Sequence, residues 1–282
     1  MTISCRKHLW HFKEVLWRFG TFLERKVPRK MKILLEIAYM GSRYHGYQTQ
    51  NNEALTIQRV LQNALEEFFG VSLKITGCSR TDAGVHAKQF YCTMEGEIHS
   101  TLPPEKIPLA MRPHLPEDIS ILSARAVNED FHPRYMTHHK EYEYYIYNAP
   151  ILHPYHAGRA WHCPVALDAA AMNAAAAHLV GRHDFAALMA QGSVVSSTVR
   201  EIYYCNVRRE GDLVIVCVAA DGFLYNLVRI SAGTLTDVGK GKIAPDRVPA
   251  ILASLDRRMA GPTLPPEGLY LNRVVYPDDL IG

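Results

Sequence analysis

The side chains best suited to chemistry lie in one short polar segment, residues 77–87, which reads Gly-Cys-Ser-Arg-Thr-Asp-Ala-Gly-Val-His-Ala. This segment places Arg80, Thr81, Asp82 and His86 in a loop between two predicted strands, and loops held by a rigid scaffold commonly carry functional groups. A carboxylate in such a loop suits a nucleophile. The alternative is a plain polar turn in which Asp82 only bonds its own backbone.

A second segment, residues 221–230, supplies a cation that could serve this carboxylate. Arg229 falls on a predicted helix that is otherwise apolar, so we expect its guanidinium to be partly buried. A buried arginine requires an acidic partner. If that partner is Asp82, the arginine would keep the carboxylate ionised and oriented, as a nucleophile requires. The alternative is an arginine that reaches solvent from an apolar helix.

A third segment, residues 131–147, interleaves aromatic rings with Arg134, Lys140 and three histidines. Single-stranded nucleic acids bind such sequences because bases stack on the rings while the cations meet phosphates. Alternating tyrosines are equally typical of an ordinary strand, above all in residues 144–147. Tyr142 is the stronger candidate for a functional ring.

Other chemistries lose support. The spacing of His153, His156, His162 and Cys163 matches no zinc pattern, so we expect no metal site. The sequence has no GxxxxGK[ST] loop, no GxGxxG fingerprint and no GxSxG elbow, which disfavours nucleotide-driven and serine-hydrolase reactions.

The predicted strands and helices that position these groups follow the same order twice along the chain. Apolar residues at helical spacing between Thr56 and Gly70 predict a helix after a strand at residues 32–39. Further strands are predicted at residues 73–78, 88–94, 119–127, 141–147, 201–208 and 213–220, and further helices at residues 168–181, 223–237 and 246–255. Two successive strand-helix-strand-strand units predict an α+β protein with an internal pseudo-repeat, joined through residues 148–156.

Composition and charge narrow the class of protein. The 282 residues are 48% hydrophobic and 21% charged, which is ordinary globular composition, and no apolar run reaches the ~20 residues needed to cross a bilayer. The six cysteines form no CxxC pair, so a reducing cytoplasmic setting is expected. Residues 1–30 hold eight Lys or Arg and two Glu, while the remainder holds 23 basic and 26 acidic residues. This basic segment has helical apolar spacing, and Met31 is a candidate start of the native chain.

The octapeptide Arg80-Thr-Asp-Ala-Gly-Val-His-Ala87 resembles the hallmark of the tRNA pseudouridine synthase A family. The resemblance covers about residues 31–277. Other segments similar to the family follow in the expected order: residues 32–48, 56–58, 131–134, 140–144, 183–185, 196–200, 222–229, 260–263 and 268–271. The chain departs from the family at Ser79, Tyr47 and Pro133, where Gly, Trp and Ala are usual, and in residues 1–30; none of these positions is the proposed nucleophile.

Carried over residue by residue, the resemblance implies that Asp82 is the nucleophile and that Arg229 pairs with its carboxylate. It implies that Tyr142 stacks on the target uracil and assists proton removal from C5, and that Arg80 helps to hold the flipped nucleotide. The implied reaction converts uridine to pseudouridine at positions 38 to 40 in the anticodon stem-loop of tRNA. Either attack at uracil C6 or a route through a ribose glycal would use one carboxylate, and the sequence leaves both open.

The family also implies a pseudouridine synthase fold, in which two related halves form a continuous antiparallel sheet flanked by helices, with the active-site cleft between them. We place the halves at residues 31–135 and 136–282. The resemblance implies a homodimer that works without a metal or organic cofactor. Two alternatives stay open: a synthase for other RNA uridines, and a non-catalytic RNA-binding or RNA-folding factor that uses the same cleft.

Overall fold

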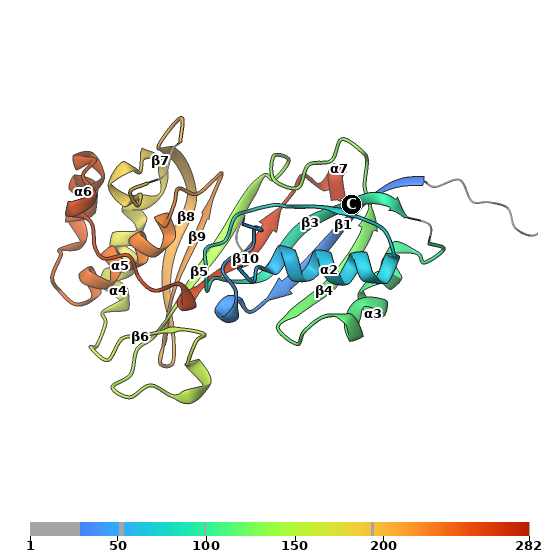
Figure 1. Ribbon diagram of the computed structural model, residues 1–282. Helices are drawn as coiled ribbons and strands as arrows, with labels where there is room; N and C mark the ends of the chain where they lie inside the picture. The colour runs from blue at the N-terminus through green and yellow to red at the C-terminus, as the bar shows by residue number, and fades with distance from the viewer. Residues whose placement is uncertain (1–28, 51–53, 99, 193–194, 282) are drawn as a thin grey trace, which may run out of the picture.

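The computed structural model describes residues 29–50, 54–98, 100–192 and 195–281, which form one extended sheet with helices packed against it (Figure 1). Most of the basic segment 1–30 lies outside the described residues, so its predicted helix and the start at Met31 stay predictions. Residues 29 and 30 already belong to the first strand. No helix in the described part of the chain is long and apolar enough to cross a membrane.

The sheet has the strand order β4-β1-β3-β10-β5-β9-β8-β7, with β2 added to β3 and β6 added to β5. Its strands are β1 (Arg29–Tyr39), β2 (Lys74–Gly77), β3 (His86–Ile98), β4 (Ile119–Ala126), β5 (His139–Tyr147), β6 (Trp161–His162), β7 (Gly181–Asp184), β8 (Val199–Glu210), β9 (Leu213–Ala220) and β10 (Leu269–Val275). The predicted strand at 213–220 is confirmed to the residue, and the other predicted strands are confirmed with shifted ends.

The sheet is mixed, which corrects the expectation that it is antiparallel throughout. The long ladders within each half are antiparallel, but β10 pairs with β3 in parallel, with Tyr270 opposite His86 and Leu271 opposite Ala87. The short β6 also runs parallel to β5. The reason is topological, since β10 returns to the middle of the sheet through a long crossover, and parallel strands require such a connection. The loops that precede β3 and β10 therefore meet at the same end of the sheet.

The division at residues 135 and 136 stays a prediction. Strand β10 comes from the last part of the chain, yet it pairs with β3 on one side and with β5 on the other. It is therefore shared by the ladders of both halves.

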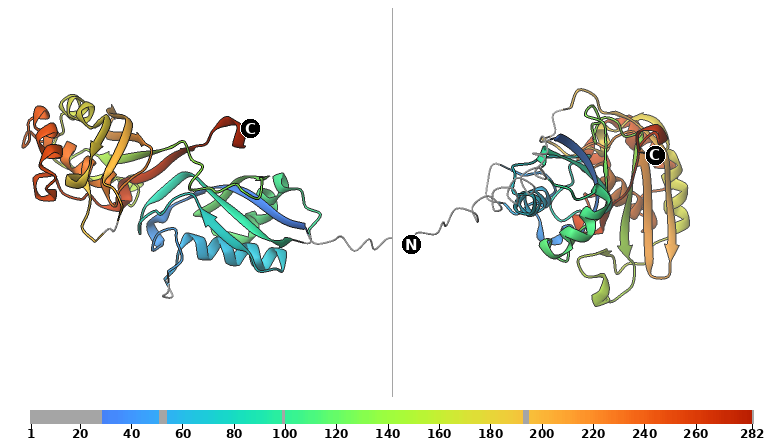
Figure 2. Two further views of the ribbon diagram at one scale, coloured as in Figure 1. Left: turned by 90° about the horizontal axis from the view of Figure 1, so that it is seen from above. Right: turned by 90° about the vertical axis from the view of Figure 1, so that its right-hand side faces the viewer.

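The helices cover the two ends of the sheet separately. They are α2 (Ile57–Phe69), α3 (Ile107–Met111), α4 (Ala169–Ala176), α5 (Leu227–Gly239), α6 (Val248–Ser254) and α7 (Asp278–Ile281). Figure 1 shows α2 and α3 beside β1, β3 and β4, and α4 to α6 beside β7 to β9; Figure 2 shows the same separation from above. Contacts join α4 to β8 and α5 to β5.

Capping residues begin and end α2 as the sequence predicts. The hydroxyl of Thr56 accepts a hydrogen bond from the backbone N–H of Arg59, and Gly70 ends the helix with a φ of 68°. The carboxylate of Asp168 caps α4 in the same way, through the N–H of Ala171. That helix ends earlier than predicted, because residues 177–179 tighten into a 3₁₀ turn.

The predicted helix at residues 223–237 begins too early. Helix α5 starts only at Leu227, because Asn226 adopts a left-handed conformation with a φ of 61° and breaks the helical path. The residues before it form a bend at Asp221 and a turn at Tyr225-Asn226 instead, and Phe223 and Tyr225 line a cavity. Local turn residues outweighed the apolar periodicity in this segment.

An ion network around the buried carboxylate of Glu143 links three strands, on the face of the sheet opposite to Tyr142. Glu143 on β5 accepts hydrogen bonds from Lys88 on β3 at 2.7 Å and from Arg208 on β8 at 2.9 Å, and the hydroxyl of Tyr145 donates to it at 2.7 Å. Burial alone would raise the pKa of the Glu143 carboxyl, but these three partners lower it to about 2. The network links β3, β5 and β8 across the sheet.

We predict that Glu143→Gln lowers the free energy of unfolding by about 1–2 kcal/mol at neutral pH, because it removes a charge that three donors stabilise. A carboxyl whose pKa is lowered on folding stabilises the protein above its ordinary pKa of 4.5, and this contribution is lost as the pH falls toward 2. The variant should therefore lose less stability than the wild type over that range. Denaturant unfolding at several pH values measures this.

Glu210→Gln is the matched control, because it removes the other carboxylate that contacts Arg208, at an exposed position. Its effect should be within about 0.5 kcal/mol. Equal losses from the two variants would contradict a structural role for the buried network.

Candidate active site

Contacts with the first strand and the loop after it fix the conformation of residues 78–85, which connect β2 to β3. The hydroxyl of Tyr39 hydrogen-bonds the Thr81 hydroxyl at 2.8 Å in a buried position. A Cβ on Gly46 would lie 2.5 Å from the Thr81 carbonyl oxygen, so only glycine permits this close approach. The backbone around Asp82 is therefore held from one side by packed chain.

Asp82 and Arg229 form an ion pair. Arg229 Nη1 lies 3.4 Å from Asp82 Oδ2. The same nitrogen donates to Asn226 Oδ1 at 2.7 Å, and Nε donates to the carbonyl oxygen of Leu264 at 2.7 Å. Arg229 is 15% exposed and Asp82 is 34% exposed, so the arginine is the more deeply placed partner. Its orientation is thus set by two acceptors other than the carboxylate.

The electrostatics of Asp82 reflect two opposed effects. Burial raises the pKa of the Asp82 carboxyl above its usual value, while the charge and hydrogen bond of Arg229 lower it. Burial is the larger of these effects, so the carboxylate lies beside a cation but is only partly hydrated. A poorly hydrated, oriented carboxylate is well suited to attack a carbon atom.

Tyr142 on β5 lies in the same cavity with its side chain almost fully buried, at 6% exposure. Its hydroxyl is 3.3 Å from the Ser79 hydroxyl, and its ring meets the Phe223 ring edge-on at a centroid distance of 4.8 Å. Burial raises the pKa of the Tyr142 phenol well above its usual value, so the phenol stays protonated. Such a group offers an aromatic edge or face and one hydrogen-bonding hydroxyl.

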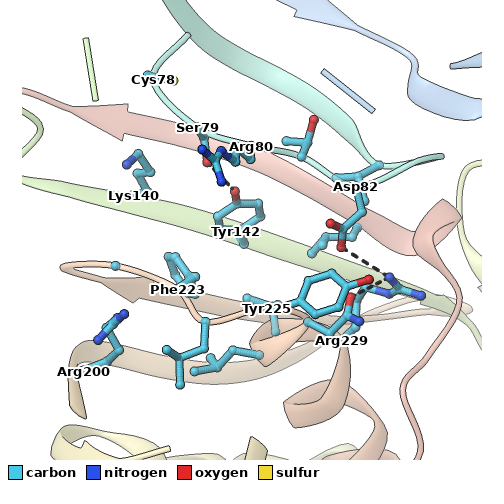
Figure 3. A pocket seen from close by; sticks show the side chains of 18 of the residues that line it. Cys78, Ser79, Arg80, Asp82, Lys140, Tyr142, Arg200, Phe223, Tyr225 and Arg229 are labelled. Atoms are coloured by element: carbon cyan, nitrogen blue, oxygen red, sulfur yellow. Dashed lines mark hydrogen bonds and ion pairs between the residues drawn. The ribbon is translucent and has the colours of Figure 1, made fainter. Parts of the chain in front are cut away.

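These groups border one cavity of about 840 Å³. All four side chains singled out in the sequence contribute to its lining: Arg80, Asp82, Tyr142 and Arg229. Figure 3 shows the Asp82–Arg229 pair at one end of this cavity, with Tyr142 beside it and Lys140 and Arg200 farther along. Arg80 is exposed, so its guanidinium is accessible to a ligand.

His86 does not belong to this cavity. It starts β3 as a fully buried residue, its Nδ1 accepts the backbone N–H of Gly41 at 2.9 Å, and its ring stacks on Tyr270. Burial lowers the pKa of the His86 imidazole. Its role is to join the first loop to the β3–β10 junction.

The tyrosines of residues 144–147 have structural roles, as expected for alternating tyrosines in an ordinary strand. Tyr144 and Tyr147 are buried in the core, and Tyr145 belongs to the ion network on the opposite face. None of these three rings lines the large cavity. Within this strand, Tyr142 supplies the ring that the cavity uses.

Lys140 is a cavity residue that sequence reasoning noted only as part of a basic aromatic strand. It is 9% exposed, and no described residue accepts a hydrogen bond or an ion pair from its ammonium group. Burial lowers the pKa of this lysine. Its position two residues before Tyr142 on one strand, hence on the same face, was the signal that could have identified it.

Asn226 is a second cavity residue that the sequence did not reveal, because a left-handed asparagine leaves no periodic pattern. Within the described residues, no group of three or more His, Cys, Asp or Glu side chains is placed to hold a metal ion.

Comparison with known proteins places this sequence in a family. The family described as tRNA pseudouridine synthase matches residues 36–136 and 175–277. The chain is 44% identical over 246 residues to "tRNA pseudouridine synthase A" of Ruminiclostridium cellulolyticum, covering 87% of this chain and 99% of the relative. It is 41% identical over 244 residues to the protein of the same name from Thermoanaerobacter sp. (strain X514), covering 86% and 99%.

Among solved structures, a chain of a Cbf5-Nop10-Gar1 complex aligns at 11% identity with a TM-score of 0.33, covering 86% of this chain and 59% of that one. A likeness at this level is too weak to assign a fold, so the assignment rests on the sequence matches. Those matches include both the loop that carries Asp82 and the helix that carries Arg229, and this chain belongs to the tRNA pseudouridine synthase family.

Proposed function

We propose that this protein isomerises uridine to pseudouridine in the anticodon stem-loop of tRNA, at positions 38 to 40, with Asp82 as the nucleophile. One observation carries the proposal: a partly buried carboxylate, held by Arg229, opens into a cavity that also presents Tyr142. Family membership supports the same reaction, since the relatives carry the name tRNA pseudouridine synthase A.

The reaction makes few demands beyond these groups. It breaks the bond between N1 of uracil and C1′ of ribose, turns the base, and joins C1′ to C5, while a proton moves from C5 to N1. No atom or electron is gained or lost, so an ionised carboxylate is sufficient as the covalent catalyst. Asp82 either attacks uracil C6 or acts at the ribose in a route through a glycal, and it is free again when the new bond is complete.

The remaining cavity residues suit a flipped nucleotide. The target base must leave its stack to reach Asp82, and enzymes that act on a base commonly stack it against apolar or aromatic side chains. Tyr142 supplies the ring, and its protonated hydroxyl supplies a hydrogen bond to the base. Arg80 lies at the exposed border of the cavity, where a cation meets the RNA backbone.

The setting of the reaction follows from the same assignment. We propose that the protein acts in the cytoplasm as a homodimer, with tRNA as its partner. Buried thiols support a reducing compartment: Cys78, Cys92, Cys163, Cys205 and Cys217 are all free within the described residues.

The first prediction concerns the nucleophile. Asp82→Asn and Asp82→Ala should lower turnover at least ~1000-fold, because no other group replaces the attacking carboxylate. Affinity for tRNA should be largely kept. Tritium release from tRNA labelled at uridine C5 measures turnover, and filter binding measures affinity.

Asp221→Asn is the matched control, because it removes another carboxylate of the same cavity that makes no ion pair with Arg229. It should retain turnover within about tenfold of the wild type. Turnover by Asp82→Ala that falls by much less than ~1000-fold would overturn the assignment. A folded wild type that binds tRNA without releasing tritium would instead support a binding factor, or a synthase for other RNA uridines.

The second prediction concerns pH. Turnover requires ionised Asp82, so it should fall on the acidic side, with a midpoint above the ordinary carboxyl value of 3.8, because burial raises the pKa of this group. Arg229 lowers the same pKa, so Arg229→Gln should move the midpoint to higher pH as well as slow the reaction. Single-turnover rates between pH 4 and 8 test this, and an unmoved midpoint in Arg229→Gln would remove the coupling between the two residues.

A further inference from the structure

A second hollow of about 290 Å³ adjoins the cavity that holds Asp82. The two hollows share four lining residues: Ser79, Arg80, Arg134 and Tyr135. The far side of the second hollow is formed by residues 47–48 after the first strand and by residues 75–77 of β2. These four residues therefore lie on the boundary between the two hollows, which we call the saddle.

Tyr135 is an exposed aromatic ring on this saddle, with 76% of its surface accessible. The ring of His132 packs on it at a centroid distance of 4.3 Å and an interplanar angle of 32°, and the guanidinium of Arg134 lies 5.9 Å from its centroid. Exposure of a large ring at a hollow, with support from neighbouring groups, is the arrangement of a stacking platform.

The loop that carries this ring is ordered by its own hydrogen bonds. The backbone N–H of Arg134 donates to His132 Nδ1 at 3.1 Å, and the N–H of Met136 donates to the His132 carbonyl oxygen at 3.2 Å. The loop begins at Phe131, which is buried in the core. The backbone that carries the ring is consequently held in position before any ligand binds, which lowers the entropy lost on binding.

The saddle also carries positive charge that the protein does not neutralise. Within the described residues, the guanidinium groups of Arg80 and Arg134 contact no carboxylate, and neither does the ammonium of the nearby Lys140. Other cations of the molecule, such as Lys88 and Arg43, are paired. Unpaired cations between two hollows suit a phosphate group that crosses from one to the other.

We propose that the second hollow is a subsite for the nucleobase that is next in sequence to the flipped uridine. This neighbouring base stacks on Tyr135. The phosphate between the two nucleotides lies over Arg80 and Arg134. The ligand is thus a dinucleotide step of the anticodon stem-loop whose two bases have both left the helical stack, and the subsite deepens the proposed function and rests on it. Stacking accepts any base, so the subsite selects an unstacked neighbour and not a particular sequence.

The test combines a variant with a modified RNA. Tyr135→Ala should raise both KM and the dissociation constant for an anticodon stem-loop RNA about tenfold, with kcat nearly unchanged, because one stacked base is lost. An RNA with an abasic residue beside the target uridine, on the 5′ or the 3′ side, should show the same loss with the wild type. On that RNA, Tyr135→Ala should cause no further loss, and Tyr135→Phe should behave as the wild type on both RNAs.

Tyr155→Ala is the matched control, because Tyr155 is similarly exposed, at 80%, and lines neither hollow. It should change no parameter by more than about twofold.

Arg134→Gln should in addition reduce the slope of log affinity against log salt by about 0.7–0.9, as expected for one lost phosphate contact.

The outcomes separate the subsite from the reaction. If Tyr135→Ala has no effect, or weakens binding of intact and abasic RNAs by the same factor on both sides, the subsite is wrong even though the wild type converts uridine. If the wild type converts no uridine, the proposed function fails, and the dissociation constants for the same RNAs still decide whether Tyr135 contacts a neighbouring base.

Discussion

A charged carboxylate in a partly dehydrated cavity is costly unless a cation is fixed beside it, and this requirement shapes the site. Asp82 and Arg229 are 147 residues apart in the chain. The arginine is oriented toward the carboxylate because Nη1 also donates to Asn226 and Nε donates to the carbonyl of Leu264. Three separate segments must therefore be in place before the nucleophile has its partner.

The centre of the sheet brings these segments together. The parallel pairing of β3 with β10 places the loop that carries Asp82 beside the connection that carries Leu264 and leads into β10. On the other edge of β10, Tyr142 of β5 lies opposite Leu271, which in turn lies opposite Ala87 of β3. Asp82 and Tyr142 thus come from segments on either side of β10, whose spacing is set by this shared strand, and backbone hydrogen bonds fix that spacing more firmly than loops could.

Local signals in the sequence predicted many helices and strands. They could not predict features that depend on contacts between distant segments. Helix α2 was predictable because Thr56 and Gly70 cap it within a few residues of the apolar pattern. The start of α5 was not, since Asn226 breaks the helix through a backbone conformation that periodicity does not record. The octapeptide at residues 80–87 indicated Asp82, but the exposure of Tyr135 depends on which distant segments leave it uncovered. The direction of β10 was likewise not predictable from local sequence, because it depends on how this strand pairs with β3 and β5.

The central position of β10 also bears on how the protein is made. A ribosome synthesises this strand after every other strand of the described sheet. Until it inserts, β3 and β5 have open edges toward each other, and unpaired edges favour association with other chains. A chain interrupted before residue 264 lacks both the central strand and the carbonyl that orients Arg229. Incomplete products of translation are thereby left without an assembled site and with exposed strand edges, the kind of surface that chaperones and proteases recognise.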